Sequence, residues 1–435
     1  MNLRPERPWW QAPRRPADPH VGRSVSFLEL FYDLVYVVLI SELSHTFSAH
    51  PTPGGALGFA FLFVTVWWAW FNGSTYHDLH GNNDLRTRVF TFIQMFTVAG
   101  MAVYAHTALE GGATGFALSY AAFQGLMAYL WWRTGVYDPD HRVLATPYAV
   151  GFLVTMSLFL ASVFVDERAR LVLWGVSVLL SLVSPLAQFN MRGSGARAQV
   201  RLLLQISPAL AERYGLFMIL VLAEVVTGSV RGVVAGEPTL AALSLGALGI
   251  GLAVMLWWLY FDLVARRRPV PQRRPVLQWI YGNLLTALSI SATGALVLAL
   301  TLQAAQSPLK SAGPLLPGAV TLFMLGTAQT ILSLQVPGRL RSLYRRSGLL
   351  TALVALLVAG LGALPLTPTF LLLAMLGAIA VPVGYGLFVW VKDFGAEDIS
   401  PDESGTTPSP AQPGSGEQHV TDDASEGTGP VRTPS

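Results

Sequence analysis

Residues 27–47, FLELFYDLVYVVLISELSHTF, are long and apolar enough to cross a membrane, yet they carry four charged or titratable side chains. These are Glu29, Asp33, Glu42 and His45. An ionised side chain near a bilayer centre costs about 2.5–3.5 kcal/mol on insertion scales, so such groups usually face a bundle interior or an aqueous path. We therefore expect this stretch to be a membrane helix that contributes to a functional site.

The composition places the whole chain in the membrane class. Of its 435 residues 52% are hydrophobic and only 12% are charged, whereas soluble domains carry roughly 25% charged residues. The absence of cysteine excludes disulfides, thiolate metal sites and cysteine nucleophiles. Residues 1–23 are polar and rich in Arg and Pro, unlike a cleavable signal peptide, so we expect the first apolar segment to remain as an anchor.

Apolar segments of about 20 residues, the length that spans a hydrocarbon core of roughly 30 Å, recur along the chain. We predict an all-α, polytopic helical membrane protein with about 12 transmembrane helices. The predicted segments are 27–47, 56–76, 89–107, 115–132, 144–165, 171–189, 209–233, 240–262, 278–303, 315–336, 349–364 and 368–391.

The distribution of basic residues predicts the orientation, because cytoplasmic loops of membrane proteins are enriched in Lys and Arg. With the N-terminus inside, 23 of the 28 Lys and Arg residues fall on the inner side and four on the outer side, and Arg213 lies within a helix. We therefore predict a multi-pass membrane protein with both termini in the cytoplasm.

The chain divides into two tails and two halves. We predict a disordered basic arm over 1–23, six-helix halves over 24–202 and 203–392, and a disordered tail over 393–435, which has almost no apolar residues. Glutamates and tryptophan pairs recur at similar spacing in the halves, which predicts a 6+6 parallel internal repeat of the kind found in secondary transporters. The matching positions are Glu29 and Glu212, Glu42 and Glu224, and Trp67-Trp68 and Trp257-Trp258.

Near the cytoplasmic end of the first segment, Ser26 and Glu29 have the spacing of a capping box. Capping is therefore the structural alternative to a functional role for Glu29. Asp33 lies one turn deeper and needs a partner. Arg213 is the best candidate, because segment 209–233 enters from the same side. The pair would be either a structural clamp or an ion-coupling switch.

Segment 209–233 carries three further signals. Ser207-Pro208 is typical of an N-cap followed by the first helical residue. Glu224 lies near the helix centre, about 20° away from the face of Arg213 at 100° per residue. A carboxyl group at this depth is a candidate proton carrier, and its structural alternative is a protonated glutamate bonded to a neighbouring helix. Gly228 and Gly232, with Gly282 and Gly294 in segment 278–303, are candidate helix breaks.

Further titratable residues lie toward the ends of the segments. Glu42 and His45 belong either to the site or to a solvated helix end. His77, His80, Asp84 and Arg88 cluster at the cytoplasmic mouth of the second segment. Their spacing resembles that of metal ligands but lacks the context of a zinc motif. We expect an ion-paired loop and no metal.

Two stretches resemble a known family. Residues 29–36, ELFYDLVY, are similar to the opening motif of the bacterial low temperature requirement A family, and residues 212–217, ERYGLF, closing on Glu224, are similar to its second signature. Ala209 and Ala223 depart from that pattern, where histidine and glycine are common. The resemblance covers about residues 22–395 and implies a multi-pass inner-membrane protein linked by name to growth in the cold. Further matching positions are Trp67-Trp68-Ala69-Trp70, Tyr76, Asp84, Arg88, Gln94 and Met95.

Three hypotheses of function follow. The leading one is a proton- or ion-coupled secondary transporter or channel for an unknown small solute or ion. The second is an enzyme acting on a lipid or headgroup through His77, His80 and Asp84, and the third is a membrane sensor or scaffold. No nucleophile elbow, phosphate loop or nucleic-acid signature occurs, so we expect no cofactor and no nucleic-acid partner. The expected partner is the lipid bilayer.

Overall fold

The structure is a computed structural model that describes residues 11–14, 25–82, 84–189, 200–235, 239–304 and 312–394. The predicted all-α fold is confirmed: the described residues form helices and no β-strand. The long helices are α1 Phe27–Ala49, α2 Pro53–His80, α3 Leu85–Tyr104, α4 Ala113–Tyr137, α5 Arg142–Ala161, α6 Glu167–Phe189, α8 Pro208–Val234, α9 Leu240–Leu263, α10 Arg273–Ala304, α11 Ala312–Ser333, α12 Arg341–Leu361 and α13 Pro368–Phe394.

Each of the twelve predicted segments overlaps one of these helices. Ten of the described helices are long and apolar enough to cross a membrane, and α1 and α4 fall outside that set. Helix α1 carries three acidic residues, Glu29, Asp33 and Glu42, among its 23 residues. The chain is therefore a membrane protein with many apolar helices, and twelve crossings remain a prediction.

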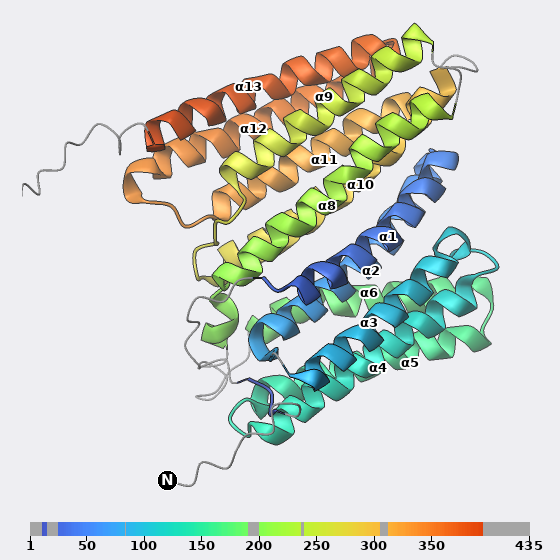
Figure 1. Ribbon diagram of the computed structural model, residues 1–435, viewed down its shortest axis with the longest axis vertical. Helices are drawn as coiled ribbons and strands as arrows, with labels where there is room; N and C mark the ends of the chain where they lie inside the picture. The colour runs from blue at the N-terminus through green and yellow to red at the C-terminus, as the bar shows by residue number, and fades with distance from the viewer. Residues whose placement is uncertain are drawn as a thin grey trace, which may run out of the picture.

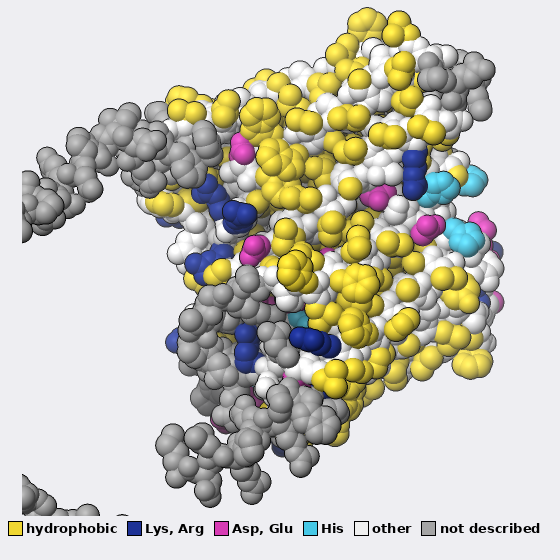
Figure 2. Space-filling view, viewed as in Figure 1, with side chains coloured by type: hydrophobic (Ala, Val, Ile, Leu, Met, Phe, Trp, Pro, Cys, Tyr) yellow, Lys and Arg dark blue, Asp and Glu magenta, His cyan; other side chains and the backbone are white. Residues whose placement is uncertain are grey.

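The helices form two groups with α1 and α2 between them. Figure 1 shows α8–α13 on one side of α1 and α3–α6 on the other. Helix α1 packs against α2 and α3 and also against α8 and α10. Figure 2 shows hydrophobic side chains over the middle of the view and charged side chains gathered mainly toward its left and right sides, where the long helices end. This is the surface expected of helices that lie across a bilayer.

Helix α10 is the most internal element. Its apolar window is 83% buried, and it packs extensively against α8 and α11. The corresponding windows of α5 and α6 are only 33% and 28% buried. Helix α10 is therefore shielded by protein, while α5 and α6 present most of their surface outward.

The glycines predicted as helix breaks are close-packing positions instead. Helices α8 and α10 run without interruption through Gly228, Gly232, Gly282 and Gly294. A Cβ atom added at Gly294 would lie 2.7 Å from the carbonyl oxygen of Glu224. Small residues let membrane helices approach closely, and that approach is stabilised by van der Waals packing. The prediction of helix breaks is therefore wrong at these positions.

The internal repeat is not confirmed. Trp67 and Trp68 in α2 are buried, whereas Trp257, the counterpart of Trp67 in α9, is 43% exposed. The matching tryptophans therefore occupy different environments, and the repeat rests on the sequence pattern alone.

Candidate functional site

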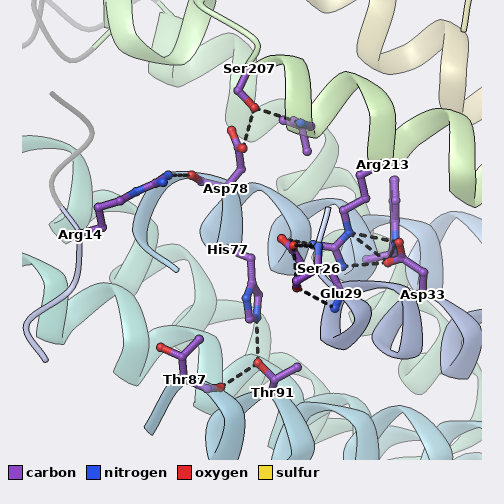
Figure 3. Close-up of polar contacts among 12 residues, drawn as sticks. Arg14, Ser26, Glu29, Asp33, His77, Asp78, Thr87, Thr91, Ser207 and Arg213 are labelled. Carbon is purple, nitrogen blue, oxygen red and sulfur yellow. Dashed lines mark hydrogen bonds and ion pairs between the residues drawn. The ribbon is translucent and has the colours of Figure 1, made fainter. Parts of the chain in front are cut away.

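The predicted pair of Asp33 and Arg213 forms at the interface of α1 and α8. The Nη2 atom of Arg213 donates to Oδ1 of Asp33 at 2.8 Å, and its Nε lies 3.1 Å from both carboxylate oxygens. Asp33 is completely buried and Arg213 is 2% exposed. This bidentate geometry is the strong form of an arginine–carboxylate contact, so the pair ties α1 firmly to α8 (Figure 3).

Neighbouring side chains complete the coordination of the pair. The indole Nε1 of Trp70, in α2, donates to Oδ1 of Asp33 at 2.7 Å. The guanidinium of Arg213 also lies 3.5 Å from Oε1 of Glu29 and 5.2 Å from the ring centre of Tyr32. Desolvating two charges is costly unless further hydrogen bonds satisfy them. Three helices therefore supply the contacts that keep this pair inside the protein.

Glu29 combines the two roles that the sequence left as alternatives. Its Oε2 accepts hydrogen bonds from the backbone N–H and hydroxyl of Ser26, both at 2.9 Å, which is the predicted capping box. Its Oε1 faces Arg213. The capping box fixes the direction in which the Glu29 side chain points, and this brings its second oxygen to the guanidinium.

The start of α8 is held against the end of α2. Ser207 is the N-cap of α8, as predicted, and Pro208 is the first helical residue. The Ser207 hydroxyl donates to Oδ1 of Asp78 at 2.6 Å while accepting from the N–H of Leu210. The guanidinium of Arg14 donates to the carbonyl of Asp78 (Figure 3). These contacts fix the position of the first turns of α8, and with them Arg213, along the axis of α2.

Glu224 lies farther along the same interface. Its half-buried carboxylate lies near the Ser41 hydroxyl of α1, and Arg231 and Glu42 are near enough to influence it electrostatically. Glu42, His45 and Arg231 are exposed. Figure 2 shows arginine, histidine and acidic side chains gathered at one end of the molecule. Glu224 is therefore a polar group between the buried pair and this charged end.

A second polar contact accompanies Glu224. The hydroxyls of Ser44 in α1 and Ser291 in α10 lie 2.7 Å apart, and both side chains are buried. Polar contacts between α1 and its neighbours thus continue beyond Asp33 toward the far end of the helix. Glu212, in contrast, is half-buried and lies about 100° around α8 from Arg213.

Three of the four predicted mouth residues make side-chain contacts at or beside the α2–α3 turn. The Nε2 of His77 lies 3.2 Å from the Thr91 hydroxyl, and the Nδ1 of His80 lies 3.0 Å from the Arg14 carbonyl oxygen. Asp84 is the N-cap of α3, and Arg88 is exposed. In the described part of the chain, no three His, Asp or Glu side chains gather as a metal would require.

Asp84 also holds residues 11–14 against this turn. The N–H of Gln11 donates to its Oδ2 at 2.9 Å, and the Thr87 N–H donates to its Oδ1 at 3.0 Å. Burial raises the pKa of the Asp84 carboxyl. The hydrogen bonds from Thr87 and Gln11 and the charge of Arg86 outweigh that effect and hold the pKa below its ordinary value. Asp84 therefore remains an anion that fastens the N-terminal segment.

Sequence reasoning missed the aromatic wall behind Asp33. Trp70 stacks on Phe217 of α8 with ring centres 4.0 Å apart, and Tyr214 packs against Trp70 and against Trp279 of α10 at 4.9 and 4.2 Å. The available signal was the spacing of Tyr214 and Phe217, which flank Arg213 by one and four positions.

The two stretches that resemble a family are those that build this site. The family model for the bacterial low temperature requirement A protein (LtrA) matches residues 24–384. The chain belongs to this family. A protein of Rhizobium meliloti (strain 1021), described only as uncharacterized, is 26% identical over 239 residues, which cover 54% of this chain and 58% of that protein. The match thus spans a little over half of the relative's length. No solved structure matches the chain.

In this LtrA-family protein, both signatures meet in space. The first supplies Glu29 and Asp33 from α1, and the second supplies Arg213 and Glu224 from α8. Ala209, where the family pattern commonly has histidine, is buried in the first turn of α8. The two motifs are therefore the two sides of one helix interface.

Proposed function

We propose that this LtrA-family protein is a proton- or ion-coupled secondary transporter or channel for a small solute or ion. The observation that carries the proposal is the α1–α8 interface. It holds a desolvated Asp33–Arg213 pair toward one end and the Glu224 carboxylate, near the Ser41 hydroxyl, toward the other. Ionisable groups inside a membrane are expensive and mark ion pathways or proton relays.

In this proposal Glu224 carries the coupling proton. It is half-buried and lies near the exposed Glu42 and Arg231, so a proton reaches it from the charged end of the molecule. Protonation removes the charge of the carboxylate and with it the attraction to Arg231. The change alters the contact between α1 and α8 at the point where Glu224 lies near Ser41.

The Asp33–Arg213 pair then acts as the gate at the opposite end. The Asp33–Arg213 ion pair keeps α1 and α8 together at that end. Arg213 also contacts Glu29, so its guanidinium has a second carboxylate partner. Exchange between two carboxylates is a route to two discrete arrangements of one interface, as alternating access requires.

Proteoliposomes loaded with a pH-sensitive dye test the proposal. Gradients of small ions and solutes are imposed in turn, and coupled proton movement is recorded. We expect the wild-type protein to move protons with at least one solute and Glu224→Gln to lose the coupling at least tenfold. Glu167→Gln, at an exposed acid in the first turn of α6, is the matched control and should behave as wild type.

Two outcomes would contradict the proposal in different ways. Full coupled flux in Glu224→Gln would remove this residue from the mechanism. A wild-type protein that is inactive toward every imposed gradient, although it is folded and inserted, would reject transport itself.

A further inference from the structure

A cavity of about 320 Å³ lies away from the α1–α8 interface, between α2, α5 and α6. This volume is at the lower end of the range of small-molecule sites. Its walls are mostly apolar, and none of its lining residues is Asp, Glu, Lys, Arg or His. The part of any molecule that enters this cavity must therefore be uncharged, because a charge would find no partner there.

The cavity opens toward the bilayer. Three of its lining residues, Val154, Leu180 and Val183, are 43%, 47% and 45% exposed, and they belong to α5 and α6, which present most of their surface outward. Both helices contain a proline in the same region, Pro147 and Pro185. A ligand thus enters from lipid rather than from water.

Most of the polar side chains around the cavity already interact with other groups of the protein. The Ser184 hydroxyl donates to the carbonyl of Ser181 at 2.8 Å, which replaces the N–H that Pro185 lacks. Ser181 donates to the carbonyl of Ser177, and Thr155 accepts from Gln124. The Tyr148 hydroxyl and the Gln188 amide lie near each other. These groups stabilise the helices and leave little for a ligand.

Asn72 is the exception. It lines the cavity from α2, its side chain is 8% exposed, and it makes no hydrogen bond with any described residue. The residue is buried as a whole, but its amide atoms are not sealed inside the protein and remain accessible from the cavity. Its N–H₂ and carbonyl offer a donor and an acceptor to a ligand, which is the pairing that a hydroxyl or carbonyl group satisfies.

We infer that this cavity binds the head of an uncharged, single-chain lipid that bears a hydroxyl or carbonyl group. The head hydrogen-bonds to Asn72, and the chain leaves between α5 and α6 into the bilayer. The inference does not depend on the proposed transport function, because the cavity shares no residue with the α1–α8 interface.

Photolabelling of the full-length protein in nanodiscs tests the site. The probe is a long-chain alcohol with a diazirine on its chain, and labelled peptides are identified by mass spectrometry. We expect label on α2, α5 or α6 beside the cavity. An unlabelled long-chain alcohol or a neutral isoprenoid quinone should compete, the first as a hydroxyl and the second as a carbonyl. A long-chain carboxylate at pH 8 should compete poorly.

A cavity-filling variant gives the decisive comparison. Gly151 lines the cavity, and a Cβ atom built there meets nothing within 4 Å, so Gly151→Phe adds a ring without a backbone clash. We expect labelling to fall at least fivefold. Gly377→Phe, at an equally open glycine on α13, is the matched control and should label as wild type. Equal labelling of Gly151→Phe and wild type would overturn the site.

The contact with the head is tested separately. Asn72→Leu keeps a similar volume and removes the hydrogen-bonding group, so labelling by the alcohol should fall about three- to tenfold, the worth of one hydrogen bond. Labelling by a diazirine-bearing alkane should not change. A loss of both labels would assign Asn72 to cavity shape instead, and an unchanged alcohol label would remove it from the site.

Discussion

At the residue scale, one buried ion pair organises the site. Asp33 receives hydrogen bonds from Arg213 in α8 and Trp70 in α2, so a single carboxylate joins three helices. The cost of desolvating both charges is offset only while all these contacts are made. Removing one member should therefore be much worse than removing both.

We predict that Arg213→Met lowers the free energy of unfolding by about 3–5 kcal/mol, because it leaves Asp33 charged, buried and without its guanidinium. The double variant Asp33→Leu/Arg213→Met should recover part of that loss. Thermal or denaturant unfolding in detergent measures both. Arg231→Met, at an exposed arginine of α8, should change stability by less than about 1 kcal/mol. Equal destabilisation in the single and double variants would contradict the explanation.

The pairing of Asp33 with Arg213 could be predicted from the sequence, because the prediction needs only the side from which each helix enters the membrane and the rise per residue of a helix. Both helices enter from the same side, and a rise of 1.5 Å per residue then places Asp33 and Arg213 at similar depth. The contact from Trp70 could not be predicted in this way. Helix α2 is apolar around most of its circumference, so no face in its sequence shows which side turns toward α1.

At the element scale, glycines set the distance between α8 and α10. Gly294 lies against the backbone of Glu224 and Val225, and Gly228 lies against Gly294. The sequence located these glycines but not their role, because a helical glycine is compatible with both a break and a close crossing. Only the partner helix distinguishes the two.

We predict that Gly294→Ala destabilises the protein by about 1–3 kcal/mol, since the added methyl group meets the backbone of α8 and overpacks the crossing. Gly384→Ala, on α13 with open space around it, should be neutral or stabilising by up to about 1 kcal/mol, because alanine favours the helix. Melting temperatures of the two purified variants check the opposite signs. If both variants shift in the same direction, the crossing does not determine the effect.

At the scale of the whole molecule, the distribution of basic residues predicts the orientation in the membrane. The prediction that both termini are cytoplasmic rests on 23 basic residues on one side of the membrane against four on the other. Composition alone supports ten helices as spans and leaves α1 and α4 outside that set. Asp33 of α1 and Arg133 of α4 are buried against neighbouring helices, so a criterion based on hydropathy undervalues these two helices.

Reporter fusions check the orientation. Alkaline phosphatase fused after Asp166, between α5 and α6, should be active, because this segment is predicted to be outside the cytoplasm. The same enzyme fused after Ser435 should be inactive, and a fluorescent protein fused there should be bright. The reverse pattern would invert the topology, and activity at both positions would mean an even number of crossings between them instead of the predicted odd number.

The length of α10 bears on how the protein matches the thickness of its membrane. A helix of 32 residues is about 48 Å long, well beyond a hydrocarbon core of roughly 30 Å. Because protein surrounds α10, lipid does not have to adapt to that surplus. Helices α3 and α5, of 20 residues each, are about 30 Å long and lie at the periphery. Hydrophobic mismatch is therefore set by the outer helices, and α10 is free to tilt or protrude without deforming the bilayer.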